Sequence, residues 1–193
     1  MRIIPMFVGL LILVSATSMS YCQSTFSFNI RPGGVDAPVF DAQGVPLAGS
    51  NYLVELYGGI DSTSLSPTTD YYTGMRVMPR FLTGIYAGYW QGNNASMTVW
   101  TPIAGMPSWL QVRAWDFRLG ATYEEVVASG LGGYGESHAF YADGANPTIF
   151  QAPAPLIGLQ SFSLRAVVPE PSALILAALG IACFSRWSWK RLD

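Results

Sequence analysis

The sequence predicts an all-β domain, a jelly-roll-like antiparallel β-sandwich with one short helix, between an N-terminal signal peptide and a C-terminal short transmembrane helix. The 193 residues include 20 glycines and 13 prolines, which favour many turns over long helices. Segments in which apolar and polar residues alternate recur along the chain, as in half-buried strands. Only 11% of the residues are charged, against roughly 25% in typical soluble domains. The net charge of −2 indicates no basic surface, so we expect no nucleic-acid partner.

Six segments of the region 21–167 are predicted to be strands. Each has alternating or β-favouring residues and is bounded by turn residues. In the longest segment, Leu110, Val112 and Ala114 are predicted to face the core, because side chains alternate across a strand. Its other face then carries Trp109 and Trp115. The predicted strands are residues 25–30, 52–57, 96–100, 109–117, 137–141 and 159–167.

One short helix is predicted at residues 122–129. Glu124 and Glu125 fall in its first turn, where the helix dipole favours acidic side chains. With Asp116 they offer a second interpretation, a carboxylate pair for glycoside hydrolysis, which needs carboxyl groups about 5 to 9.5 Å apart. Consecutive helix residues point about 100° apart, since a turn holds 3.6 residues. The dipole interpretation is therefore preferred.

The first 20 residues have the composition of a signal peptide. Arg2 supplies one positive charge, residues 3–14 form an apolar run, and small or polar residues follow at 15–20. Cleavage is predicted before Tyr21. Cleavage after Ser18 or near Cys22, and an uncleaved anchor, are the alternatives.

The C-terminal end carries a second apolar run, at residues 173–184. No charge interrupts it, but as a helix its 12 residues span only about 18 Å. A membrane span normally needs about 20 residues, and counting 172–189 gives a marginal span of 18. The basic residues that follow predict a cytoplasmic C-terminus and a domain outside the membrane. These residues are Arg186, Lys190 and Arg191.

The order of three features at this end resembles the PEP-CTERM sorting tail. Pro169, Glu170 and Pro171 come first, then the apolar run and then the basic end, over residues 168–193. The resemblance implies a Gram-negative cell that makes extracellular polysaccharide. It also implies an exosortase, a membrane enzyme that recognises the tail, cleaves near it and releases or transfers the protein. A plain C-terminal anchor is the alternative. The predicted parts are thus a signal peptide at 1–20, a domain at 21–167 and a sorting tail at 168–193.

Little in the sequence points to catalysis or to a bound metal. His138 is the only histidine, and Ser137 beside it on a strand would point to the opposite face. We therefore predict no catalytic residue, no cofactor and no metal site, and a protein that is not an enzyme. Four aspartates of predicted loops leave calcium as a minor alternative, although they lack a calcium-loop spacing. They are Asp36, Asp41, Asp61 and Asp70.

Aromatic residues are the remaining candidates for function. Flat rings bind the faces of sugars, although most aromatic residues of a sandwich belong to its core. The candidate glycan-binding residues are Tyr89, Trp90, Trp100 and Trp109. The sequence thus predicts a non-catalytic structural or adhesive protein, with a carbohydrate-binding module as the alternative. We expect it to be anchored in the inner membrane with its domain in the periplasm, then to reach the cell surface or matrix. The expected partners are the processing enzyme, the membrane and extracellular polysaccharide.

Overall fold

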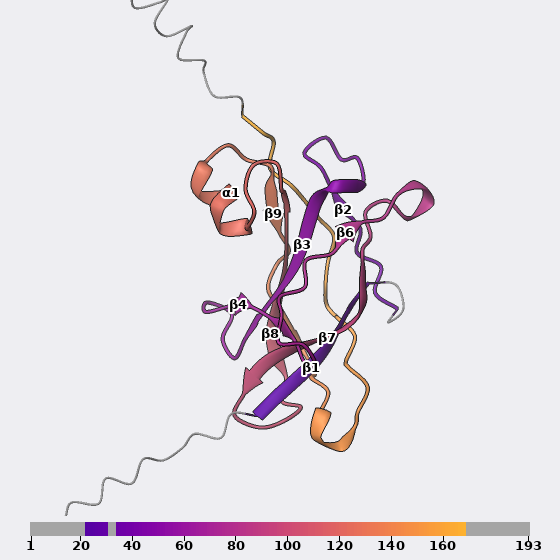
Figure 1. Cartoon of the computed structure of the whole chain (residues 1–193), viewed down its shortest axis with the longest axis vertical. Helices are drawn as coiled ribbons and strands as arrows, with labels where there is room; N and C mark the ends of the chain where they lie inside the picture. The colour runs from indigo at the N-terminus through magenta and orange to yellow at the C-terminus, as the bar shows by residue number, and fades with distance from the viewer. Residues whose placement is uncertain (1–21, 31–33, 169–193) are drawn as a thin grey trace, which may run out of the picture.

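The computed structural model describes residues 22–30 and 34–168, which form a mostly β domain with one short α helix (Figure 1). The predicted signal peptide at 1–20 and the predicted transmembrane helix at 173–184 lie outside these residues. Among the described residues, no helix has the length and apolar character needed to cross a membrane.

The first sheet has three antiparallel strands in the order β1-β7-β5. The strands are β1 (Cys22–Asn29), β7 (Gln91–Thr101) and β5 (Thr69–Asp70). In β1, Phe26 and Phe28 alternate with polar residues, and both side chains are fully buried. Phe26 lies opposite Met97 of β7, which is also fully buried. The period-2 pattern of residues 25–30 and 96–100 therefore identified two strands of this sheet correctly.

The second sheet has six strands, with the order β10-β8-β3-β4 along its main path. β6 and β9 pair with β3 and β8, respectively. The strands are β10 (Phe140–Ala142), β8 (Ser108–Asp116), β3 (Gly49–Gly59), β4 (Ser66–Pro67), β6 (Arg80–Phe81) and β9 (Tyr134–Glu136). Leu110, Val112 and Ala114 of β8 are fully buried, as the alternation predicted.

Apolar residues of both sheets belong to one hydrophobic core. Phe26 and Met97 come from the first sheet, and Leu56 and Val112 come from the second. Burial of such side chains is the main stabilising contribution to a fold. The prediction of a mostly β fold with antiparallel sheets is confirmed.

Helix α1 (Tyr123–Ser129) covers a second, smaller core on the other side of β8. The hydroxyl of Thr122 accepts a hydrogen bond from the backbone of Glu125, whose carboxylate in turn accepts from the backbone of Thr122. This capping box begins the helix at the predicted place. Beneath α1, Trp115 is fully buried together with Tyr123. The alternation assigned Trp115 to this face but did not predict that a helix would cover it.

Two predicted strands are shorter than expected. Within residues 137–141, residues 137–139 are not in a strand: Val112 N donates to the Ser137 hydroxyl rather than to a backbone carbonyl, which interrupts the ladder with β8. Within residues 159–167, only β11 (Phe162–Ser163) is a strand, and it pairs in parallel with β2 (Val39–Phe40). Two short 3-10 turns, η1 (Gly84–Tyr86) and η2 (Pro147–Ile149), complete the elements.

Candidate functional site

The predicted catalytic candidates have separate structural roles. The hydroxyl of Ser137 is buried, accepts from Val112 N at 3.0 Å and donates to the carbonyl of His138 at 2.9 Å. His138 itself is exposed, and no hydrogen bond joins its ring to Ser137. A nucleophile needs a base within hydrogen-bond reach, so this pair lacks the arrangement of a catalytic dyad.

The three carboxylates of the hydrolase interpretation also have different partners. Glu125 completes the capping box, and Glu124 accepts from the Tyr57 hydroxyl at 2.5 Å. Asp116 pairs with Arg118 at 2.5 Å. Burial acts to raise the pKa of Asp116, but the hydrogen bonds from Arg118 outweigh it and hold that pKa below its usual range.

A cluster of charged and aromatic groups, which we call the Arg113 cluster, lies on the outer face of β3 and β8 beside α1. The Arg113 guanidinium lies 3.9 Å from the centre of the Tyr57 ring, close enough for a cation–π contact. Its nitrogens lie 3.8 Å from Glu124 and 3.7 Å from Glu136. Burial first, and then the neighbouring glutamates, raise the pKa of the Tyr57 hydroxyl. The cluster comprises Tyr57, Gln111, Arg113, Tyr123, Glu124 and Glu136.

Next to this cluster, sequence reasoning missed a buried ion pair. Glu55 of β3 is fully buried, and both of its carboxylate oxygens accept from the guanidinium of Arg76. Burial raises the pKa of Glu55, although Arg76 acts to lower it. The available signal was a single carboxylate within the otherwise apolar run of residues 52–57. Buried charges require a partner, so this carboxylate could have indicated that a positively charged side chain lies nearby.

The four aspartates that were predicted to lie in loops all accept hydrogen bonds from nearby groups, although Asp70 lies in strand β5 and not in a loop. Asp41, Asp61 and Asp70 accept hydrogen bonds from backbone N–H groups two to four residues further along the chain. Asp36 accepts from the hydroxyl of Tyr89. Aspartates often stabilise turns in this way. Within ranges 22–30 and 34–168, no group of three or more His, Cys, Asp or Glu side chains is placed to hold a metal ion.

The four aromatic candidates are not brought together. Trp90 is only 3% exposed, packs on Phe28 and donates its indole N–H to the Phe28 carbonyl at 3.2 Å. It belongs to the core, which corrects its prediction as a surface aromatic. Tyr89 is half-buried and bonded to Asp36, as described above. The half-buried ring of Trp109 packs against Tyr141 with ring centres 5.4 Å apart.

Trp100 is the most exposed of these four residues. It lies on β7 with 56% of its surface exposed and lines a pocket between β7 and the segment that follows β3. Because Trp100 belongs to the first sheet and Trp109 to the second, the structure offers separate aromatic surfaces rather than one platform.

The C-terminal segment of the domain is bonded to the fold up to its last described residue. Leu164 N donates to Phe40 O at 2.9 Å, and Val168 N donates to Leu131 O at 2.7 Å. Between them, Arg165 exchanges two backbone hydrogen bonds with residues 133 and 134. Gly132 lies against this segment with φ of 84°, and a Cβ there would be only 2.0 Å from the Ala166 carbonyl oxygen. Glycine is therefore required for the segment to dock.

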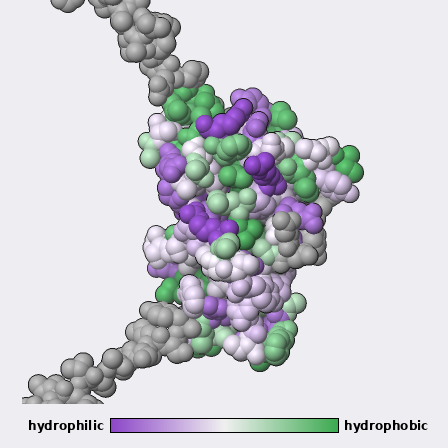
Figure 2. Space-filling view, viewed as in Figure 1, coloured by the Kyte–Doolittle hydropathy of each residue, from purple (hydrophilic) through white to green (hydrophobic). Residues whose placement is uncertain are grey.

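The chain leaves the domain beside α1, at the end opposite to the start of β1 (Figure 1). Val167 and Val168 are exposed there, and Figure 2 shows a hydrophobic surface at this point. A family profile described as the PEP-CTERM protein-sorting motif matches residues 167–191. The chain carries this sorting motif. This motif supports the interpretation that the protein is exported, anchored at a membrane and sorted by an exosortase.

The match confirms the resemblance that was inferred from Pro169, Glu170 and Pro171. These residues lie outside the described part, as do the predicted basic residues Arg186, Lys190 and Arg191. Comparison with curated proteins and comparison with solved structures found no match. The sorting motif overlaps the folded domain by two residues, Val167 and Val168.

Proposed function

We propose that the protein is a non-catalytic structural or adhesive component of the cell surface or extracellular matrix, held at the inner membrane until its tail is processed. One observation carries this proposal: the sorting motif begins on the last two residues of a folded domain. No long linker separates the two. The folded domain is therefore the part of the protein that the sorting tail directs to the cell surface or matrix.

The proposed orientation follows from the two ends of the chain. A signal peptide exports the domain, and the apolar run 173–184 then stops in the membrane. Arg186, Lys190 and Arg191 hold the C-terminus in the cytoplasm, so the domain lies in the periplasm. From Val168 to residue 173 an extended chain reaches at most about 18 Å. Before processing, the domain would thus stay close to the membrane surface.

A non-catalytic role is supported by the pairing of the domain's charged groups. Glu55, Asp116 and Glu124 each have an arginine or tyrosine partner. We also propose that the domain is a β-sandwich of jelly-roll-like form. Two antiparallel sheets that share one core support this architecture. Such a domain presents a rigid surface for contacts outside the cell.

The sorting step can be tested by changing Pro169 and Pro171 to Ala in a host with an exosortase. Proline on both sides of Glu170 favours an extended segment that a processing enzyme can bind. We expect normal export but no processing, so that full-length protein accumulates in the membrane fraction on immunoblots.

The matched control is a second proline pair, Pro153→Ala with Pro155→Ala, which lies within the domain and outside the motif. This control should be processed like the original protein. Deleting residues 173–193 should release the exported domain as soluble protein. If the Pro169/Pro171 variant is processed at the normal rate, the tail is only a membrane anchor and the proposal fails.

A second candidate function is carbohydrate binding. It is favoured by the exposed indole of Trp100 at the rim of a pocket with many hydroxyl groups. Extracellular polysaccharide would be the corresponding partner.

A further inference from the structure

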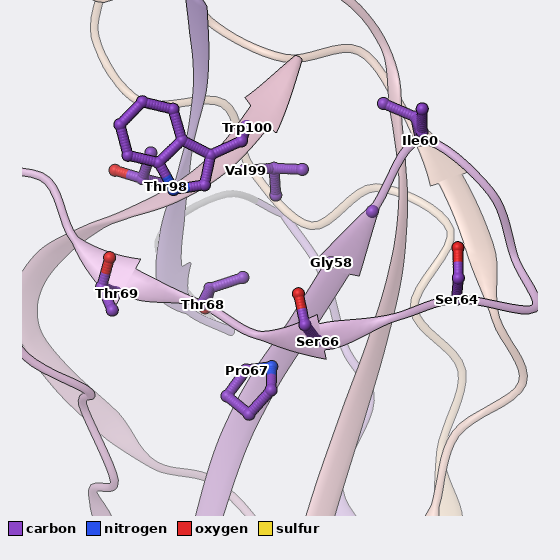
Figure 3. Close-up of a pocket in the computed structure, with 11 residues that line it drawn as sticks. Gly58, Ile60, Ser64, Ser66, Pro67, Thr68, Thr69, Thr98, Val99 and Trp100 are labelled. Atoms are coloured by element: carbon purple, nitrogen blue, oxygen red, sulfur yellow. The ribbon is translucent and has the colours of Figure 1, made fainter. Parts of the chain in front are cut away.

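A pocket of about 230 Å³ lies where the chain passes from the second sheet to the first (Figure 3). β4 pairs with β3, whereas β5, only two residues further along the chain, pairs with β7. Thr68 lies between β4 and β5. The pocket is bounded by the end of β3, by this crossing segment and by the end of β7. We call it the Trp100 pocket. Its lining residues are Gly58, Gly59, Ile60, Ser64, Ser66, Pro67, Thr68, Thr69, Thr98, Val99 and Trp100.

The pocket depends on two glycines at the end of β3. A Cβ on Gly58 would lie 2.4 Å from Cγ2 of Val99, and one on Gly59 would lie 2.8 Å from the Ser64 carbonyl oxygen. Real Cβ atoms do not approach other atoms so closely. The absence of side chains here allows the crossing segment and β7 to form the two walls.

Hydroxyl groups dominate the polar lining. Five of the eleven lining residues are serine or threonine, and none carries a charge. Figure 3 shows the side chains of Ser66 and Thr69 on the crossing segment and that of Trp100 on β7. An uncharged pocket disfavours ions and acidic ligands, because a charge taken from water needs a partner of opposite sign. The lining instead suits a neutral ligand with many hydroxyl groups.

One buried hydroxyl of the lining has no partner in the described part of the chain. Thr98 is only 4% exposed, and its hydroxyl forms no hydrogen bond, whereas the hydroxyl of Thr68 donates to Leu56 O at 2.8 Å. Buried polar groups are nearly always bonded, so each exception requires an explanation. The Thr98 oxygen is closed off from solvent, however, so the hydroxyls that a ligand could reach are those of the more exposed Ser64, Ser66 and Thr69.

Trp100 provides the apolar surface that such a ligand also needs. Its indole is more than half exposed at the rim of the pocket, whereas most tryptophan surface is buried in folded proteins. The C–H groups on one face of a sugar ring pack on an aromatic face, and the sugar hydroxyls can then bond at the edge. Trp100 and the serine and threonine side chains together provide both kinds of contact.

We infer that the Trp100 pocket binds one neutral sugar unit of a polysaccharide, an inference that rests on the carbohydrate-binding candidate and not on the sorting proposal. Pockets for drug-sized molecules measure roughly 300–1,000 Å³, so this smaller pocket matches a single sugar ring. Its position agrees with this role. Trp100 pairs with Gln23 near the start of β1, at the end of the domain opposite to the tail (Figure 1). A polysaccharide outside the membrane could therefore reach it while the tail is still anchored.

The test measures binding of neutral oligosaccharides of glucose, mannose and galactose to the purified full-length protein by isothermal titration calorimetry. We expect at least one of them to bind, and Trp100→Ala to weaken its affinity at least tenfold. Tyr141→Ala is the matched control, because Tyr141 is 54% exposed on β10 of the other sheet. It should change the affinity less than twofold.

Thr69→Val separates a ligand role from a structural one, because Thr69 lines the pocket and is partly exposed. Valine has the shape of threonine without the hydroxyl, so the variant should keep its Tm and still weaken sugar binding. Equal affinity of Trp100→Ala and the original protein would overturn the pocket assignment. Loss of binding in Tyr141→Ala alone would also overturn it and would place the sugar on the Trp109–Tyr141 surface. If none of the probes binds, both the pocket and the carbohydrate-binding candidate fail, whereas the sorting proposal is tested separately by tail processing.

Discussion

At the scale of single residues, the ion pair between Glu55 and Arg76 is the electrostatic feature with the largest expected effect on stability. The Glu55 carboxylate is fully buried, and the Arg76 side chain is 35% exposed. Removing one partner of a fully buried pair costs about 3–5 kcal/mol, because the other charge stays uncompensated. Since Arg76 is partly solvated, we expect Arg76→Ala to lower the free energy of unfolding by somewhat less, about 2–4 kcal/mol.

The same variant should increase the dependence of stability on pH. Burial raises the pKa of Glu55 above its ordinary value of 4.5, so the folded state holds a proton more tightly than the unfolded state. Stability from this group is then present at pH below about 4.5 and is lost as the pH rises through the folded-state pKa. Arg76 opposes the shift, so Arg76→Ala should raise this pKa further and increase the total stability that is lost.

Denaturant unfolding between pH 4 and pH 8 measures both effects. Adding Glu55→Gln to Arg76→Ala removes the titrating group and should remove most of the added pH dependence. If Arg76→Ala is as stable as the original protein at pH 7, water or another group compensates Glu55 and our assignment of the pair is wrong.

At the scale of elements, a substitution in β8 tests whether the buried and outer faces of the second sheet are assigned correctly. Val112 is fully buried at its centre and lies opposite Leu56 of β3. Val112→Asp would place an unpaired carboxylate in the core and should lower the free energy of unfolding by several kcal/mol, roughly 4–5 or more. Val45→Asp is the control, since Val45 is exposed in a loop and surface changes usually stay within about 0.5 kcal/mol. Thermal unfolding followed by circular dichroism compares the two, and equal Tm values would contradict the core assignment.

The elements also show what the sequence could predict. β1, β3, β7 and β8 are 8 to 11 residues long, and alternation over that length predicts both strand and face. β2, β4, β5 and β6 have two residues each, too few for any periodicity, and they form because partner strands lie beside them. Helix α1 was predicted from its acidic first turn, but the burial of Trp115 beneath it depends on tertiary packing.

Candidate site residues were less predictable, because their exposure and grouping also depend on tertiary packing. Composition identified the aromatic residues, but not that Trp90 enters the core while Trp100 remains at a pocket rim. The pocket lining comes from three chain segments, at 58–60, 64–69 and 98–100, that only the fold brings together. By contrast, the sorting motif is a continuous segment, which is why its residues could be recognised directly from the sequence.

At the scale of the whole molecule, the boundary between domain and tail is the feature on which delivery depends. Residues 164–168 contribute backbone hydrogen bonds to residues 40, 131, 133 and 134, and Leu164 is buried in the main core. The last residues before Pro169 are therefore part of the fold. Processing within the tail can then release a domain that keeps all of these contacts.

Two truncations test this boundary. Residues 21–168 should fold alone, with a β-dominated circular dichroism spectrum and a Tm within about 2 °C of the full-length protein, because stability changes below roughly 0.5 kcal/mol shift Tm by only a few degrees. Residues 21–161 lack β11, Leu164 and the hydrogen bonds of the C-terminal segment. This shorter chain should unfold at much lower temperature or fail to fold, since burial of one leucine alone contributes about 1.5–3 kcal/mol. A predominantly helical spectrum of residues 21–168 would contradict the fold, and equal Tm values for the two truncations would show that residues 162–168 are not part of the stable domain.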